Sequence, residues 1–237
     1  NNEVKKHRDG IYFEFVKNSI IKGNISEGNV RYGLHFMFSD YNKYLGNTFE
    51  NNGSGVAVMY GSFIEMKDNT FINNWGPASY GLLLKEIKDG DIKNNIFKRN
   101  TTAIYGEGAL RMNISNNTFE RNGWAMKVLS SCMENEVRDN NFIENSFSVF
   151  TNSPRNYNEF TNNYWSEYKG YDLDKDGFGD VPHRPVSLFT YIVEQCEPAL
   201  LLMKSNFIAL LELAEKAAPS ITPEALVDDK PRMRPIW

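Results

Sequence analysis

One histidine and two methionines carry the side-chain atoms in this sequence that are best suited to a soft metal ion. His35 and Met37 are two residues apart, and Met59 follows Met37 by 22 residues. Imidazole nitrogen and thioether sulfur favour Cu(I) over harder ions. Glu14, 23 residues before Met37, offers a carboxylate. If the fold brings these four residues together, they form a candidate copper site; the alternative is a partner-binding patch, because methionine commonly fills apolar surfaces.

A second group of possible metal ligands is an aspartate-rich segment in the last third of the chain. Carboxylates at alternate positions followed by Gly177 are typical of the first half of a calcium loop. The candidate calcium ligands are Asp172, Asp174, Asp176, the carbonyl oxygen of Phe178, and Asp180. His183 occupies the position of the bidentate glutamate of an EF-hand. The segment therefore predicts either a structural calcium site or a solvated polar turn.

The elements that must position these residues follow from a repeat. Asparagine recurs every 22 to 26 residues, at Asn1, Asn24, Asn47, Asn69, Asn95, Asn117, Asn140 and Asn162. An aromatic residue follows most of them by two positions, and another asparagine follows by five. This period suits three short strands and tight turns, so we expect one coil of a right-handed parallel β-helix per repeat. Asparagines at equal offsets would then hydrogen-bond from coil to coil, in turns that need their tolerance of left-handed backbone.

The most regular predicted strand decides which side chains share a face. It recurs at residues 10–15, 33–38, 55–60, 81–86 and 103–107. Because side chains alternate across a strand, Leu34 and Phe36 point inward while His35 and Met37 point outward. The register places Met37 over Met59 and Glu14 one coil away, within about 5 to 7 Å. We therefore expect an exposed cluster of His35, Met37 and Met59.

Composition limits the other possibilities. A chain of 237 residues with 41% hydrophobic and 24% charged residues is typical of a folded protein. A net charge of −4 with mixed signs argues against nucleic acid as a partner. The chain begins at a ladder asparagine, so we expect a mature or truncated piece that lacks earlier coils. Cys132 and Cys196 are far apart and form no metal or redox motif, so they are expected to be unpaired, although a bridge stays possible in an oxidising compartment.

The asparagine period stops before the carboxyl-terminal region. The predicted organisation is a β-helix at 1–170, the aspartate-rich turn at 171–185 and a helical capping and docking region at 186–237. A short helix beginning near Ser187 and a longer one from Pro198 to Ala218 are expected, followed by an extended tail at 219–237 that could order on a partner. The apolar residues expected to dock a partner are Phe189, Leu201, Met203, Phe207 and Leu211. Charged residues within the longer helix make it unfit to span a bilayer.

Several segments of the chain together resemble the NosD family. They are Tyr-Gly-Leu-His-Phe-Met-Phe at 32–38, Gly-Val-Ala-Val-Met at 55–59, Asn-Tyr-Trp-Ser at 163–166, the aspartate-rich run at 171–182 and Pro-Arg-Met-Arg-Pro at 231–235. The resemblance runs through essentially the whole chain. It implies a periplasmic β-helix that takes part in maturing the copper site of nitrous oxide reductase and is not itself an enzyme.

The resemblance also implies partners and a ligand. They are the permease subunit of a membrane ABC transporter, a copper-carrying lipoprotein and the reductase, with Cu(I) bound transiently. The alternative is a polysaccharide-binding or polysaccharide-cleaving β-helix. Cleavage needs clustered carboxylates, whereas Glu14 and Glu107 are well separated on the predicted outer face. A purely structural repeat would leave the histidine–methionine cluster without a purpose.

Overall fold

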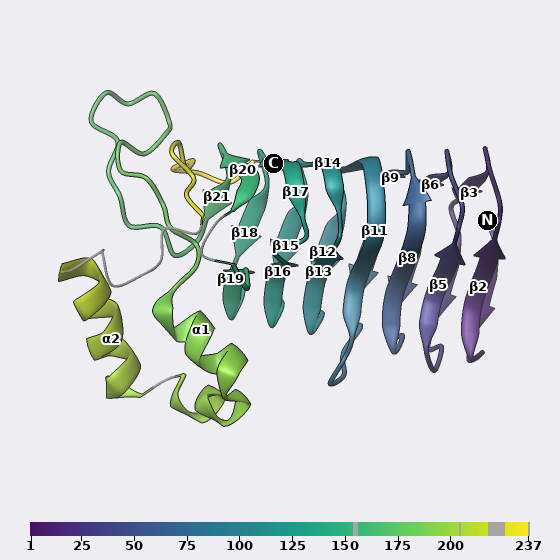
Figure 1. Cartoon of the computed structure of the whole chain (residues 1–237), viewed down its shortest axis with the longest axis horizontal. Helices are drawn as coiled ribbons and strands as arrows, with labels where there is room; N and C mark the ends of the chain where they lie inside the picture. The colour runs from purple at the N-terminus through teal and green to yellow at the C-terminus, as the bar shows by residue number, and fades with distance from the viewer. Residues whose placement is uncertain (154–155, 204, 218–225, 237) are drawn as a thin grey trace.

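The chain forms a parallel β-helix, which confirms the fold predicted from the repeat. A computed structural model describes residues 1–153, 156–203, 205–217 and 226–236. Strands of successive coils lie side by side along the long axis, from β2 near the amino terminus to β19, β20 and β21 at the other end (Figure 1). Every pair of named strands that hydrogen-bond is parallel, as one repeat per coil requires.

The coils build three columns of strands. The first column is an eight-stranded sheet of β1 (Glu3–Lys5), β4 (Ile25–Glu27), β7 (Thr48–Glu50), β10 (Thr70–Ile72), β12 (Ile96–Lys98), β15 (Thr118–Glu120), β18 (Asn141–Ile143) and β21 (Tyr164–Trp165). The second column contains β2 (Asp9–Glu14), β5 (Tyr32–Met37), β8 (Ser54–Ser62), β11 (Tyr80–Lys93), β13 (Thr102–Glu107), β16 (Trp124–Val128) and β19 (Phe147–Phe150). The third contains β3 (Ile20–Lys22), β6 (Lys43–Leu45), β9 (Glu65–Lys67), β14 (Leu110–Ser115), β17 (Met133–Arg138) and β20 (Tyr157–Thr161), and β11 is long enough to join the second and third columns.

A buried asparagine ladder connects the coils. At each step from Asn24 onward the backbone N–H and the side-chain amide of one asparagine donate to Oδ1 of the next, at 2.9 to 3.0 Å. The two ends differ from the prediction, because Asn2 and Asn163 occupy the ladder positions instead of Asn1 and Asn162.

The left-handed backbone was predicted at the ladder asparagine, but it lies at the residue immediately before, as at Asn116 with φ 55°. At the last turn Asn162 does have the predicted left-handed backbone, with φ 57°, while Asn163 forms the ladder. Asparagine or glycine is favoured at such a position because it tolerates positive φ. Many turns therefore contain two adjacent asparagines with different tasks, one setting the backbone and one forming the ladder.

Aromatic side chains fill the interior beneath this ladder. The stack consists of Phe49, Phe71, Phe97, Phe119, Phe142 and Trp165, with neighbouring ring centroids 4.1 to 5.4 Å apart. Trp165 ends the stack where the period from Asn162 predicted Tyr164. The inward residues of the second column, including Leu34 and Phe36, are buried as predicted.

The carboxyl-terminal helices cover the outer face of the last coils. Helix α1 (Leu188–Gln195), capped by Ser187, is the predicted short helix. The 3-10 helix η1 (Glu197–Leu202) and α2 (Asn206–Ala217) replace the predicted continuous helix from Pro198 to Ala218, of which Lys204 and Ala218 lie outside the described residues. Ala199 and Ile208 are both buried in one cluster with Phe147 and Phe189. A straight helix would separate Ala199 from Ile208 by roughly 13 Å, so the break lets both reach the same cluster.

The described part of the predicted tail, residues 226–236, closes the end of the solenoid, while residues 219–225 and 237 lie outside the described residues. Residues 226–236 run beside β20 and β21 (Figure 1), and Asp228 forms backbone bridges with Phe160 and His183. The buried carboxylate of Asp228 accepts hydrogen bonds from the backbone N–H, 3.0 Å, and side-chain amide, 3.1 Å, of Asn163. Its same oxygen accepts from the indole of Trp165 at 3.0 Å. The ladder therefore ends on a residue that lies outside the repeat.

Candidate metal centre

The second column brings the predicted copper ligands onto one outer face. Met37 at the end of β5 is in register with Met59 on β8, and Glu14 at the end of β2 is in register with Met37. His35 lies two residues before Met37 on the same strand. The predicted register of the two methionines is thus confirmed, and both side chains are half-buried.

His35 is buried, which corrects the prediction that it is exposed. Only 7% of its surface is accessible, because the rings of Tyr12 and Tyr32 lie over it with centroids 5.3 and 4.8 Å from the imidazole. Neither Nδ1 nor Nε2 has a hydrogen-bond partner among the described residues. Two orphaned imidazole nitrogens in a buried position are unusual, since buried polar atoms are normally paired.

The surroundings keep this imidazole neutral. Burial lowers the pKa of His35 below its usual 6.5, and nearby Arg31 adds to the effect, while Asp9 and Glu14 oppose it. A pKa below its usual value leaves the ring unprotonated at neutral pH. A neutral imidazole has a lone pair available to a metal ion.

Glu14 has another contact beside its possible role as a ligand. Its Oε2 accepts a hydrogen bond from the Tyr12 hydroxyl at 3.1 Å. Because the Tyr12 ring covers His35, Glu14 helps to hold that cover in place. Glu14 is exposed and borders the methionine pair on one side, and Lys85 borders it on the other.

An exposed ridge of aromatic side chains flanks these residues. Phe15, Phe38 and Tyr60 each follow a member of the Glu14–Met37–Met59 series by one position and stack with centroids 5.3 and 5.1 Å apart. All three have left-handed φ, between 49° and 55°. Sequence reasoning missed this aromatic ridge, although aromatics at intervals of 22 and 23 residues were a usable signal.

The same column gives the polysaccharide-cleaving alternative no support. Glycosidases use two carboxylates close together. Glu14 and Glu107 lie on this column, but Met37, Met59 and Lys85 separate them in register. Glu107 also pairs with Lys85 at 3.0 Å.

The aspartate-rich turn brings three of its five candidate ligands together. Asp172, Asp174 and Asp176 each offer an oxygen within 4.8 Å of the others. Asp180 instead accepts a hydrogen bond from the Leu173 backbone at 2.7 Å. The Phe178 backbone forms a bridge with Arg232 of the tail. The calcium site stays a prediction, with the three converging carboxylates as its core.

Excess calcium is expected to raise the melting temperature by about 3 °C or more, since ligand bound only to the folded state adds stability. Replacing Asp174 by alanine removes a ligand and should abolish that shift. Differential scanning fluorimetry with calcium and with a chelator measures it. Asp229→Ala, an exposed residue outside the turn, should keep the full shift. Equal melting temperatures with and without calcium in the wild type would leave the segment a polar turn.

The five predicted docking residues separate into two groups. Phe189 is buried, and Met203 and Leu211 are half-buried against it. Leu201 and Phe207 are 90% and 52% exposed. Other exposed apolar residues of the helices are Leu200, Leu202, Leu210 and Leu213. Partner docking by this region remains a prediction.

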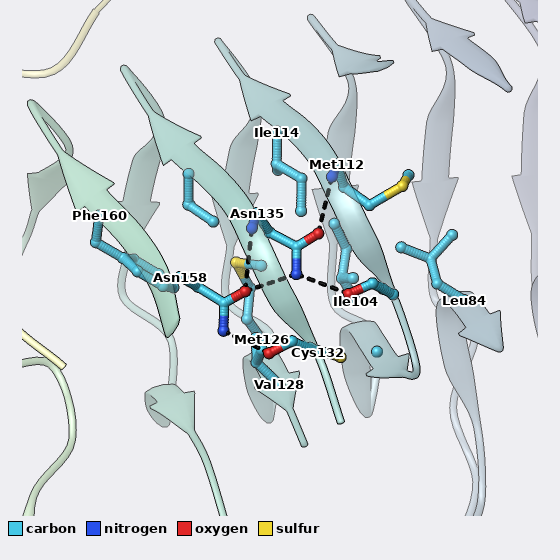
Figure 2. A pocket seen from close by; sticks show the side chains of 13 residues that line it. Leu84, Ile104, Met112, Ile114, Met126, Val128, Cys132, Asn135, Asn158 and Phe160 are labelled. Atoms are coloured by element: carbon cyan, nitrogen blue, oxygen red, sulfur yellow. Dashed lines mark hydrogen bonds between the residues drawn. The ribbon is translucent and has the colours of Figure 1, made fainter. Parts of the chain in front are cut away.

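Cys132 and Cys196 are unpaired, one buried and the other exposed. Cys132 lines a void of about 20 Å³ inside the last coils, beside Asn135 and Asn158 (Figure 2). This void is apolar core and contains none of the predicted ligands. None of the described helices has the length and apolar character needed to cross a membrane.

Comparisons with known proteins show which proteins the chain resembles. Residues 1–170 match a family model described as "Periplasmic copper-binding protein (NosD)". Two curated relatives, from Stutzerimonas stutzeri and Pseudomonas aeruginosa, are each named probable ABC transporter binding protein NosD. They are 27% and 28% identical over 135 residues, which is 56% of this chain and 31% and 32% of theirs. The matched part is therefore about a third of the length of these relatives.

A solved structure described as ORF18 of Geobacillus virus E2 resembles the chain with a TM-score of 0.58. The match has 18% identity and covers 78% of this chain and 42% of the viral protein. At that identity the likeness concerns the fold alone.

Proposed function

Since the chain belongs to the NosD family of periplasmic copper-binding proteins, we propose that it binds Cu(I) through His35, Met37 and Met59. Family membership also confirms the predicted periplasmic location. The observation that carries the proposal is the buried His35, whose two ring nitrogens lack partners beside a register-matched pair of thioethers. Neighbouring strands are about 4.8 Å apart and alternate residues of one strand about 7 Å apart, so three flexible side chains can converge on one ion.

The ligand set favours a monovalent ion. Imidazole and thioether are neutral, and Glu14 is engaged by the Tyr12 hydroxyl. A buried divalent charge without anionic ligands costs more free energy than a single charge. Soft sulfur ligands also favour Cu(I). Cu(I) is therefore the proposed ion, with Glu14 at the border of the site.

The partial exposure of the methionines suits a site that transfers copper to a partner. Met37 and Met59 are half-buried, so one side of a bound ion would remain accessible to an incoming ligand. The adjoining aromatic ridge of Phe15, Phe38 and Tyr60 offers apolar surface for a partner at that side. Transient binding follows from a ligand set without a negative charge, two members of which are only half-buried.

The proposed role is non-enzymatic maturation of the copper site of nitrous oxide reductase. The partners proposed are an ABC transporter permease, a copper-carrying lipoprotein and the reductase itself. The names of both relatives link them to an ABC transporter, which supports the first partner. The exposed leucines of η1 and α2 are the proposed docking surface for the permease.

Anaerobic titration with Cu(I) against a chromophoric competitor tests the site. Met37→Ala and Met59→Ala should each weaken affinity roughly tenfold or more, which corresponds to about 1.4 kcal/mol. His35→Phe keeps an aromatic ring between Tyr12 and Tyr32 but removes both nitrogens, and should weaken binding at least as much. Met133→Ala removes an exposed methionine of β17 and is the matched control, with affinity unchanged. Wild-type affinity in all three site variants would exclude this location.

A further inference from the structure

The described residues form three asparagine ladders, and most of their steps share one hydrogen-bond pattern. In the second ladder, from Asn29 to Asn145, the backbone N–H of Asn122 donates to Oδ1 of Asn145 at 3.0 Å. The Asn122 side-chain amide donates to the same oxygen at 3.0 Å and to the carbonyl of Phe97 at 3.0 Å. The last asparagine of a ladder has no following asparagine. Its backbone N–H and one amide hydrogen therefore point to where the next Oδ1 would lie, and another acceptor is needed there.

Two of the three ladders have that oxygen supplied by the chain itself. In the first, a carboxylate oxygen of Asp228 accepts both N–H groups of Asn163. In the third, Asn135 donates to Asn158, and Oδ1 of Asn156 then accepts from the Asn158 backbone at 3.2 Å and side chain at 2.7 Å. Figure 2 shows the Asn135–Asn158 step of this ladder.

The second ladder ends differently, at Asn145. Its side-chain amide donates to the Phe119 carbonyl at 2.9 Å. Within the described residues, no atom accepts from its backbone N–H or from the second hydrogen of its amide. The sequence has Tyr168 at the equal offset, 23 residues on, and the Tyr168 hydroxyl donates to the Val181 carbonyl at 2.6 Å. Asn145 instead lines a pocket of about 360 Å³ between the last coil and α1.

The pocket around Asn145 is polar and contains a cation. Arg184 and the hydroxyls of Ser187 and Thr190 line it. It also contains one carboxylate, Glu167, which accepts a hydrogen bond from Ser148 and lies 3.8 Å from Nε2 of His183. Glu167 is thus engaged within the wall, and Arg184 contributes a guanidinium to the lining.

A second pocket, lined mostly by apolar side chains, adjoins the polar one. It shares Ser146, Phe147 and Ser187 with it and is lined further by Phe189, Ile208 and Glu215. The Glu215 carboxylate accepts a hydrogen bond from the Leu188 backbone. Its volume is about 140 Å³, which suits one aliphatic side chain. The two pockets together fit a group that carries an oxygen anion next to an apolar side chain.

We infer that the Asn145 end of the second ladder binds a carboxylate of a partner peptide, with an adjacent apolar side chain in the pocket against Phe189. The carboxylate takes the position that Asp228 occupies at the end of the first ladder and accepts the two N–H groups of Asn145. Asp228 shows that a carboxylate fits two such donors in this fold. Arg184 favours an anion over a neutral amide.

The experiment follows the Asn145 backbone and side-chain signals in ¹⁵N NMR of the full chain. N-acetyl-leucine carries a terminal carboxylate beside an apolar side chain and should shift both signals saturably, in about the millimolar range expected of so small a probe. N-acetyl-leucine amide lacks the charge and should leave them unchanged. An equal response to both probes would overturn the inference. Acetate should bind at least several-fold more weakly, because the apolar contact is missing; equal binding of acetate would exclude the peptide as ligand.

Two variants locate the contact. Asn145→Asp keeps the acceptor for Asn122 but replaces amide hydrogens by negative charge, so binding should be lost. Arg184→Gln leaves the ladder intact and should weaken binding several-fold, which keeps the test valid if the first variant fails to fold. Asn156→Asp, at the closed end of the third ladder, is the control and should bind as the wild type does. Wild-type binding in Asn145→Asp or Arg184→Gln, with the fold verified by melting, would contradict the assignment.

A peptide with its carboxylate on a side chain identifies the source of the group. Acetyl-glutamyl-leucine amide offers a side-chain carboxylate, whereas N-acetyl-leucine offers a terminal one. Tighter binding of the first supports an acidic residue within a partner chain. Tighter binding of the second supports a partner's carboxyl terminus.

Discussion

Replacing Asn117 by alanine is expected to destabilise the solenoid by about 4 kcal/mol or more. The Asn117 side chain is fully buried and takes part in four hydrogen bonds. It accepts from the backbone and amide of Asn95, and it donates to Ile92 and Asn140 at 2.8 and 3.0 Å. Alanine leaves the buried partners on both neighbouring coils unsatisfied, and each such group costs about 1 to 3 kcal/mol.

The adjacent residue provides the control. Asn116 is exposed, has φ 55° and contributes a conformation but no ladder bond. Asn116→Ala should cost only about 1 kcal/mol, the strain of alanine in a left-handed position. Urea unfolding followed by circular dichroism compares the two midpoints. Similar losses at both positions would contradict the division of tasks between the paired asparagines.

Asp228→Ala is expected to open the carboxyl-terminal end of the solenoid and to cost about 3 to 5 kcal/mol. The change removes the oxygen that accepts three buried N–H groups, two from Asn163 and one from Trp165. Hydrogen exchange at the Trp165 indole should accelerate by at least about a hundredfold, because that proton loses its acceptor. Trp165 fluorescence follows the same opening during thermal unfolding.

The matched variant is Asp228→Asn. Every preceding step of this ladder uses an asparagine oxygen as acceptor, so the amide should retain most of the stability. Indole exchange should stay close to the wild-type rate in this variant. If Asp228→Asn were as damaging as Asp228→Ala, the closure would depend on the negative charge and not on the position of an oxygen.

The fold could be predicted from the sequence because each coil of a solenoid repeats the same strands, turns and inward-facing positions. One period gave the coil, the inward face and the register that pairs Met37 with Met59. The period could not choose between adjacent asparagines such as Asn162 and Asn163, since spacings of 22 to 26 residues admit either. Backbone conformation separates them, and a sequence does not display φ.

Contacts that do not follow the repeat could not be predicted from its period. Asp228 closes a ladder from 65 positions away, with no offset in common with the coils. Alternation along a strand placed His35 on the outer face, but the cover provided by Tyr12 and Tyr32 depends on side chains of the same and the neighbouring strand. The copper ligands could therefore be proposed from sequence, whereas the burial that leaves both imidazole nitrogens unpaired could not.

The regular stacking of strands gives this molecule a fixed internal distance. Five strand steps separate β5, which carries His35 and Met37, from β19, on which the helices pack. At about 4.8 Å per step, the proposed metal ligands lie roughly 24 Å along the axis from the helical end. Gain or loss of a whole repeat would change this spacing in increments of about 5 Å while leaving both ends chemically intact. The number of coils is thus a means by which evolution can adjust the distance between the histidine–methionine cluster and the helices.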